Sequence, residues 1–298
     1  MSGDGRAGVS AGPGRGPLTA RELVEAALAE DLGRGDRTTE WSVPQGARGR
    51  ARIVAREAGV VAGTEVAGTA FRLLEPAAAP TWLREDGERV EADGTVARLG
   101  GPLAPLLAAE RTALNFLGRL SGVATLAARF VAAVEGTRCR ITDTRKTTPG
   151  WRRLEKAATA AGGAVNHRMG LDDMVLLKEN HLRAAGGVEA ALEAVLPRAR
   201  EVGLDVEVEV TDAAELEAAL AAAPERILLD NMEPGELGRA VERARELDPA
   251  DRPLLEASGG VTLETVREVA EAGVDLISVG ALTHSAPALD LSMLVEEA

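Results

Sequence analysis

Short apolar runs recur through the second half of this 298-residue chain, and each is followed by polar or charged residues. Ala/Glu/Arg-rich stretches of helical character separate the runs. Strands that alternate with helices predict a parallel sheet, either closed as a barrel or open and doubly wound. A barrel is favoured because no Gly-x-Gly-x-x-Gly sequence follows any run and because chemically active residues stand at nearly every strand end. The seven expected strands, one fewer than in the usual barrel of about eight, are residues 139–142, 164–167, 175–178, 206–210, 227–229, 254–257 and 276–279.

The N-terminal region has a different character. Residues 1–17 are rich in Gly, Ala, Ser, Arg and Pro, which predicts a disordered tail without the apolar stretch of a signal peptide. Residues 18–33 predict a helix with Thr19 as its N-cap, Glu22 completing a capping box, and Gly33 at its end. A capped helix therefore opens the fold.

Two further segments complete the N-terminal half. Residues 48–101 alternate apolar and polar side chains between glycine turns, which favours the antiparallel strands of a small α+β domain. Residues 104–134 predict a long helix, interrupted at Ser121 and Gly122, that bridges this domain and the barrel.

Composition limits the partners and the location of the protein. The net charge of −13 and the lack of a basic stripe with interleaved aromatics argue against a nucleic-acid partner. No apolar run approaches the roughly 18 residues expected of a membrane helix. The single cysteine, Cys139, allows no intrachain disulfide, which fits a reducing cytoplasm. Cys139 lies between two arginines, but we interpret it as a small buried apolar residue rather than a nucleophile.

Basic residues follow three successive strands of the expected barrel. Arg145, Arg168 and Lys178 would meet at the carboxyl ends of the strands, where barrels place their active sites. Inward-facing cations repel one another unless an anion lies between them, so the pattern predicts a site for a small anionic substrate. His167 has two readings, as a neutral donor to a carboxylate or as an ordinary hydrogen-bonded histidine.

Acidic residues and glycines follow the later strands. Glu209 and Asp230 would face either a magnesium-bound sugar phosphate or a cationic transition state. The alternative is an internal salt bridge to Lys146 or Lys178. The segments EASGG and SVGALTHS expose backbone N–H groups near helix starts, which favours a phosphate-binding loop.

Several longer segments are more distinctive: EDLGRGDRTTE at residues 30–40, TDTRKTTPG at 142–150 and GGAVNHRMGLDDMVLLKENH at 162–181. They resemble a known family, the quinolinate phosphoribosyltransferases of NAD biosynthesis, also called nicotinate-nucleotide pyrophosphorylases (carboxylating). The resemblance covers all but the tail of the chain. It implies a seven-stranded α/β barrel at residues 123–285 and an N-terminal α/β sandwich domain at 18–122, completed by residues 286–298. It also implies a homodimer or larger assembly with an active site shared between subunits.

The resemblance further implies a reaction and residue roles. Quinolinate and 5-phosphoribosyl-1-pyrophosphate would give nicotinate mononucleotide, pyrophosphate and carbon dioxide. Mg²⁺ would accompany the sugar diphosphate with no direct protein ligand, and Glu209 and Asp230 would reach it through water. The catalytic positions that match the family are Lys146, Glu209 and Asp230. The substrate-binding positions are Arg111 (delivered by the partner subunit), Thr144, Arg145, His167, Arg168, Lys178, Ser258, Gly259, Gly260, Val279, Gly280 and Ala281.

Three alternatives remain open at this level. A related transferase could act on another nitrogen heterocycle such as nicotinate. Lys178 could form a Schiff base in a lyase. A catalytically silent barrel could bind phosphoribosyl metabolites as a sensor.

Overall fold

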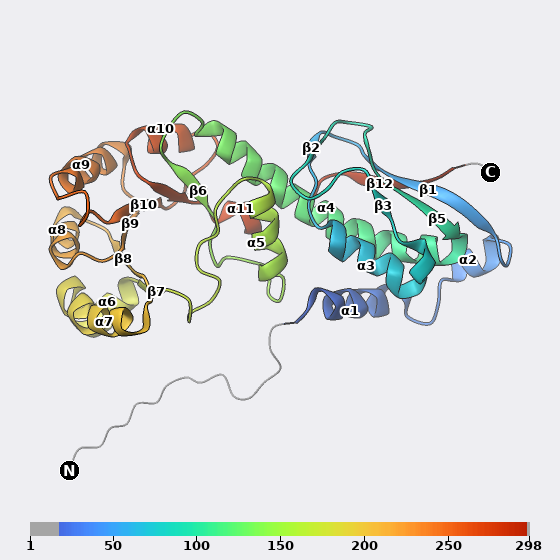
Figure 1. Cartoon of the computed structure of the whole chain (residues 1–298), viewed down its shortest axis with the longest axis horizontal. Helices are drawn as coiled ribbons and strands as arrows, with labels where there is room; N and C mark the ends of the chain where they lie inside the picture. Colours follow the sequence, from blue (N-terminus) through green and yellow to red (C-terminus); the bar gives the residue numbers. More distant parts are fainter. Residues whose placement is uncertain (1–17, 297–298) are drawn as a thin grey trace, which may run out of the picture.

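The computed structural model describes residues 18–296, and the expected disorder of the tail concerns residues 1–17, which lie outside this range. Figure 1 shows two parts, an N-terminal α/β domain and a C-terminal barrel-like domain, with one long helix running from the first into the second. Each part has its own cluster of buried apolar side chains. The site at the strand ends therefore belongs to the second part.

The N-terminal domain is built on an antiparallel sheet. Its strand order is β12-β1-β5-β3, with a separate β2-β4 pair. The first helix begins with the expected capping box, because Glu22 N–H donates to Thr19 Oγ1 at 3.2 Å and Thr19 N–H donates to Glu22 Oε2 at 2.8 Å. The elements are α1 (Ala20–Leu32), α2 (Arg37–Ser42), β1 (Arg48–Ala55), β2 (Gly59–Val60), α3 (Thr64–Leu74), η1 (Pro76–Ala78), β3 (Thr81–Trp82), β4 (Arg89–Val90) and β5 (Thr95–Pro102).

The long helix α4 (Leu103–Ala133) is continuous, so the expected interruption at Ser121 and Gly122 is wrong. These small residues instead let other chain segments approach the helix. Ser121 Oγ accepts a hydrogen bond from Ala62 N–H at 3.0 Å. A Cβ at Gly122 would lie 1.9 Å from the carbonyl oxygen of Pro287, so only glycine fits where the C-terminal segment crosses α4.

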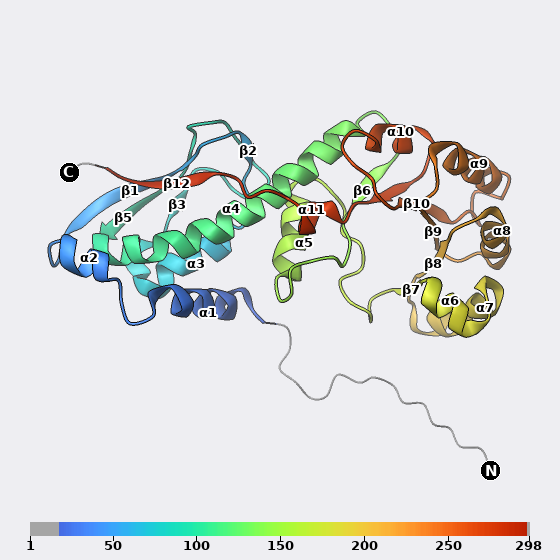
Figure 2. The same cartoon turned by 180° about the vertical axis from the view of Figure 1, so that it is seen from behind.

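That crossing returns the chain to the first domain. After the crossing, β12 (Leu291–Glu296) pairs antiparallel with β1, with Val295 opposite Ala51. Figure 2 shows β12 beside β1, far from the strands that precede it in sequence. The extreme C-terminal strand is thus part of the N-terminal sheet.

By length and composition α4 could cross a membrane, since an 18-residue window has a mean hydropathy of 1.3. The sequence expectation that no segment approaches this length is therefore wrong. However, 56% of that window is buried inside the protein, and residues of α4 belong to both core clusters. α4 has the burial of a core helix.

The C-terminal domain contains a parallel sheet of six strands in the order β6-β11-β10-β9-β8-β7. The expected strand at residues 164–167 is reduced to one bridge between Val165 and Thr142, so a closed seven-stranded barrel does not form among residues 18–296. The ladder ends after Val165 because the next in-register N–H, that of His167, donates to the Asp143 carboxylate instead of a backbone carbonyl. The strands are β6 (Arg140–Thr142), β7 (Val175–Leu177), β8 (Val206–Val210), β9 (Arg226–Asp230), β10 (Leu254–Ser258) and β11 (Leu276–Ser278).

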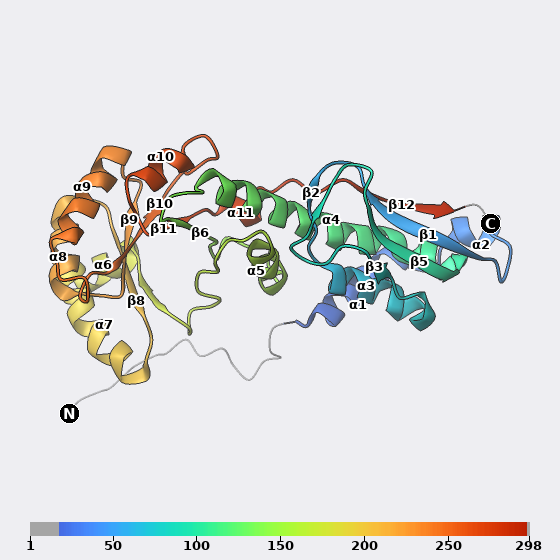
Figure 3. The same ribbon diagram turned by 45° about the horizontal axis from the view of Figure 1, so that its top comes forward.

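Helices cover the outer face of this sheet (Figure 3). In β8, Val206, Val208 and Val210 are fully buried under the helices, so the alternating Glu207 and Glu209 face the opposite side of the sheet. The helices of this domain are α5 (Arg152–Ala161), α6 (Glu179–Ala185), α7 (Val188–Val202), α8 (Ala213–Ala222), α9 (Pro234–Arg245), α10 (Val266–Glu271) and α11 (Ala281–His284), and α5 and α11 lie beside α4 (Figure 3).

Candidate active site

A pocket of ≈ 610 Å³ opens at the carboxyl ends of the parallel strands. Eleven of the residues singled out from the sequence line it: Thr144, Arg145, Lys146, His167, Arg168, Lys178, Glu209, Asp230, Ser258, Gly259 and Gly260. The lining also includes Leu176, Leu228, Asn231, Glu256 and Ser278, which the sequence expectation did not assign to the site. Strand alternation could have found Leu228 and Glu256, because each lies two residues before a predicted site residue on the same strand.

The arginines form the most desolvated part of the basic side. The Nε atoms of Arg145 and Arg168 are buried and have no hydrogen-bond partner among the described residues. Burial, together with the charge of Arg145, lowers the pKa of Arg168 from its usual value. One guanidinium nitrogen of Arg168 donates to the carbonyl of Met174 at 3.1 Å. Two half-buried guanidinium groups with buried, unpaired Nε–H donors favour carboxylate ligands.

The acidic side faces these cations. Lys178 Nζ donates to Glu209 Oε2 at 2.7 Å, which is one of the salt bridges anticipated as an alternative to a functional role. Asn231 Nδ2 donates to Asp230 Oδ2 at 2.7 Å. Burial and the neighbouring Glu209 raise the pKa of Asp230. The two carboxylates thus lie close enough to repel each other and would be stabilised by a cationic ligand.

The segment after β10 can hold only glycine at position 259. Its φ is +104°, and a Cβ there would lie 2.1 Å from Asn231 Oδ1. Gly280, two residues after β11, lies against Lys146, since a Cβ there would be 3.0 Å from the lysine Cδ. The backbone can therefore approach a ligand closely beside Lys146.

A buried ion pair that the sequence reasoning missed holds the basic loops. Lys156 and Asp143 are fully buried and paired. Asp143 Oδ1 also accepts the N–H of His167 at 2.8 Å, and Lys156 Nζ donates to the carbonyl of His167 at 2.9 Å. Both backbone groups of His167 are thereby fixed. The signal available in the sequence was a lysine on the first helix after the strand-end aspartate.

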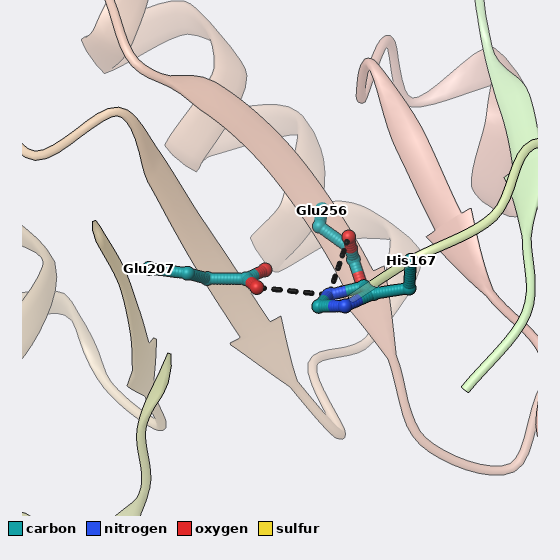
Figure 4. Close-up of side chains that lie close together, drawn as sticks. All are labelled: His167, Glu207 and Glu256. Carbon is teal, nitrogen blue, oxygen red and sulfur yellow. Dashed lines mark ion pairs between the residues drawn. The ribbon is translucent and has the colours of Figure 1, made fainter. Parts of the chain in front are cut away.

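His167 also contacts two buried acids through its side chain (Figure 4). Its Nε2 lies 2.9 Å from Glu207 Oε2 and 3.6 Å from Glu256 Oε2. Both glutamates have no exposed surface. Burial, followed by the charge of Glu207, raises the pKa of Glu256 to about 7. The three side chains form one cluster, of which His167 and Glu256 line the pocket.

The remaining sequence-predicted residues lie outside the pocket lining. Arg111 is exposed on α4, in the N-terminal domain. Val279, Gly280 and Ala281 adjoin the pocket through the loop after β11, where Val279 N–H donates to the carbonyl of Thr142 at 2.9 Å. Cys139 is buried, and burial raises the pKa of its thiol to about 12, so it packs as an apolar residue.

The fold and the pocket define a class of protein, an α/β protein with a parallel sheet whose strand ends gather cations, carboxylates and glycine-rich loops around one pocket. Residues 123–294 match the family model "Quinolinate phosphoribosyl transferase, C-terminal domain", and residues 36–121 match the corresponding N-terminal domain. The chain belongs to the quinolinate phosphoribosyl transferase family.

Individual relatives agree with this assignment. The chain is 44% identical over 280 residues to the nicotinate-nucleotide pyrophosphorylase [carboxylating] of Mycobacterium leprae, covering 92% of this chain and 96% of the relative. It is also 44% identical, over 268 residues and 90% of each chain, to a probable enzyme of the same name from Synechocystis sp.. The solved structure of the nicotinate-nucleotide pyrophosphorylase from Francisella tularensis superimposes with a TM-score of 0.87 at 37% identity, over 93% of this chain and 96% of that one.

Proposed function

We propose that the pocket performs the reaction for which the family is named. Quinolinate attacks 5-phosphoribosyl-1-pyrophosphate through its ring nitrogen, pyrophosphate leaves, and loss of the 2-carboxylate as carbon dioxide gives nicotinate mononucleotide. The observation that carries the proposal is the single pocket that joins Arg145, Arg168 and Lys178 to Glu209 and Asp230. A pyridine dicarboxylate needs such fixed cations, and a developing ribosyl cation needs such carboxylates.

Quinolinate would bind on the arginine side of the pocket. The buried Nε atoms of Arg145 and Arg168 offer donors that the described residues leave unpaired. A bidentate carboxylate contact would satisfy them and would offset the cost of their burial. Lys178 and Thr144 line the same pocket and would complete the anion site.

Bond cleavage at the sugar would depend on the acidic side. As pyrophosphate departs, positive charge develops on the ribose ring, and Glu209 and Asp230 would stabilise that charge. Lys146, also in the lining, would neutralise the leaving diphosphate. The ring nitrogen becomes cationic once ribosylated, so it can accept the electron pair released when the carbon dioxide leaves; a proton then replaces the carboxylate at the same carbon.

The sugar 5′-phosphate would bind at the glycine-rich end. Ser258, Gly259 and Gly260 line the pocket there, and the loop that contains Val279, Gly280 and Ala281 adjoins it. The positive φ values of Gly259 and Gly260 turn the backbone so that N–H groups can face an anion.

Magnesium would enter with the diphosphate of the sugar substrate. Glu209 and Asp230 supply oxygen atoms at neighbouring strand ends, and the raised pKa of Asp230, caused by burial and then by Glu209, reflects a need for positive charge nearby. Mg²⁺ keeps several of its waters, so both carboxylates would act through water rather than as direct ligands. The ion would supply neutralisation of the diphosphate charge.

Arg111 supports a site shared between two subunits. Its side chain is exposed on the part of α4 that belongs to the N-terminal domain, outside the pocket of its own subunit. We propose a homodimer, or a larger assembly, in which Arg111 of one subunit reaches quinolinate in the other. The enzyme is further proposed to act in the cytoplasm, where the single buried cysteine stays a thiol.

Mixing two inactive variants tests the shared site. Arg111→Ala and Glu209→Ala subunits, unfolded and refolded together, are expected to recover about a quarter of the wild-type activity, because one of the two sites in each mixed dimer receives both intact residues. The refolding of wild type alone provides the control. No recovery from a mixture that does form mixed dimers would contradict the sharing of Arg111.

Substrate choice tests the proposed function. Purified protein with Mg²⁺ and 5-phosphoribosyl-1-pyrophosphate is expected to form mononucleotide from quinolinate and to show little turnover of nicotinate, whose single carboxylate would leave cations unpaired. Turnover of nicotinate alone would favour the related-transferase alternative. A covalent adduct with a keto substrate after borohydride reduction would favour a Schiff-base lyase at Lys178, and binding without any turnover would favour a silent barrel.

A further inference from the structure

A network of polar side chains lies beside the pocket, where α5 and α11 pack against α4 (Figure 1). It joins Arg119 of α4 to Glu155 of α5 and to Thr283 of α11. Glu155 and Thr283 have no exposed surface, and none of the three side chains lines the pocket. Buried polar groups are costly unless they are hydrogen-bonded, so the partners of this network show what it holds in place.

Arg119 holds the segment that follows β11. Its Nη1 donates to the carbonyl of Ala286 at 2.6 Å. Its Nη2 donates to the carbonyl of Thr283 and, at 3.1 Å, to Glu155 Oε1. Two backbone carbonyls are thereby fixed to α4, from which they are separated by 164 and 167 residues of sequence.

Glu155 holds the loop that follows β6. Its Oε2 accepts the backbone N–H of Thr148 at 2.9 Å, and its Oε1 accepts the hydroxyl of the same threonine at 2.8 Å. Because Arg119 also donates to Oε1, the buried carboxylate has donors at both oxygens. The ion pair of Arg119 and Glu155 therefore fixes both the loop after β6 and the segment after β11.

Thr283 connects these two segments at a residue of the pocket. Its Oγ1 donates to the carbonyl of Lys146 at 2.8 Å. The carbonyl of Gly280 is farther from the same hydroxyl, at 3.2 Å, so the single hydroxyl proton is better placed toward Lys146. The Lys146 side chain lies against Gly280, where a Cβ would be 3.0 Å from the lysine Cδ. Both the backbone and the side chain of Lys146 thus contact the segment after β11.

We propose that Thr283 is a positioning residue for Lys146. Its hydroxyl fixes the Lys146 carbonyl to a segment that Arg119 holds, so the lysine enters the pocket beside the backbone of Gly280. A flexible lysine loses less freedom on binding a diphosphate when its backbone is fixed beforehand. The inference rests on the proposed function for its ligand, but binding of diphosphate can be measured without turnover.

Isosteric substitution isolates the hydroxyl of Thr283. Thr283→Val keeps the volume and removes the donor, so it is expected to lower kcat/KM for 5-phosphoribosyl-1-pyrophosphate about tenfold, with the KM for quinolinate changed less than about twofold. Thr283→Ser keeps the hydroxyl and loses a buried methyl group, so it is expected to stay within about twofold of wild type. Thr69→Val is the matched control, because that hydroxyl donates within α3, to the carbonyl of Glu65 at 2.8 Å, and its loss should change neither constant.

A double-mutant cycle tests whether Thr283 acts through Lys146. Lys146→Ala removes the ammonium group that the hydroxyl positions, so adding Thr283→Val to it is expected to lower kcat/KM for 5-phosphoribosyl-1-pyrophosphate by less than a further factor of about two. A residue that only supports the fold would cost about tenfold in both backgrounds. Thr283→Ala also lacks the hydroxyl and adds no bulk, so it takes the place of the valine variant if that variant does not fold.

Calorimetric binding of inorganic pyrophosphate with Mg²⁺ measures the same positioning without catalysis. Thr283→Val is expected to raise the Kd for pyrophosphate about tenfold, and Thr283→Ser and Thr69→Val should leave it within about twofold of wild type.

Four results would overturn the inference: an unchanged pyrophosphate Kd in Thr283→Val or Thr283→Ala, a Thr283→Ser variant as impaired as Thr283→Val, an equal loss for quinolinate, or an additive loss in the cycle. Weakened pyrophosphate binding in Thr283→Val, in a protein that does not turn over quinolinate, would instead support the positioning role and contradict the proposed function.

Discussion

Replacing Arg145 with alanine is expected to raise the KM for quinolinate by about a hundredfold, because the change removes a desolvated guanidinium from a bidentate carboxylate contact. Arg145 follows β6 and lines the pocket, and its Nε is buried with no partner among residues 18–296. The KM for 5-phosphoribosyl-1-pyrophosphate should change far less, since the phosphate loops lie at other strand ends. Initial rates with each substrate varied in turn measure both constants.

Two controls accompany the Arg145 variant. Arg153→Ala removes an exposed arginine from the neighbouring helix α5 and should leave both KM values unchanged. Arg145→Lys keeps the charge but lacks the planar fork, so it should recover only part of the affinity. A hundredfold loss shared by both substrates, or an unchanged KM for quinolinate, would mean that Arg145 does not bind the dicarboxylate.

Replacing Glu209 with alanine is expected to lower kcat by about a hundredfold to a thousandfold with little change in either KM, because its carboxylate stabilises charge that exists mainly in the transition state. Glu209 lines the pocket from the end of β8 and is only 13% exposed. Its salt bridge with Lys178 shows that it can hold a cation within 2.7 Å. Steady-state rates and a single-turnover measurement at saturating substrates test the expectation.

The controls for Glu209 distinguish charge from packing. Glu209→Gln keeps the shape and loses the charge, so it should be nearly as slow as the alanine variant. Glu193→Ala removes an exposed glutamate from α7 and should leave kcat unchanged. A fully active Glu209→Gln enzyme would show that its negative charge is not needed for bond cleavage.

The sequence predicted the strands and the pocket lining well because both follow short-range rules. Strand β8 has the bounds expected for residues 206–210. Its alternation of Val and Glu places all the valines on one face, toward the helices, only in a strand. Capping of α1 by Thr19 likewise depends on neighbours within one turn. Arg145 and Asp230 meet in one pocket because parallel strands end at the same edge of the sheet.

Features that depend on long-range contacts were missed. Gly122 was predicted to interrupt the helix. In the structure it leaves room for the backbone of Pro287, which lies far away in the chain. The residue 164–167 segment has strand-like composition, yet only Val165 makes a bridge, because pairing depends on the partner strand rather than on local propensity. The buried ion pair of Lys156 and Asp143 was not predicted, because the sequence argument considered only residues at the strand ends and Lys156 lies on a helix.

The central claim is that the strand-end cluster is one site for quinolinate and the sugar diphosphate. The ratio of carbon dioxide to pyrophosphate released in one reaction tests this claim most directly. Quinolinate labelled in its 2-carboxylate would be supplied with Mg²⁺ and 5-phosphoribosyl-1-pyrophosphate, and labelled carbon dioxide and pyrophosphate would be counted in the same reaction. Release of both in equal amounts, and only when both substrates are present, is the predicted result. Pyrophosphate without carbon dioxide, or carbon dioxide without the sugar substrate, would contradict it.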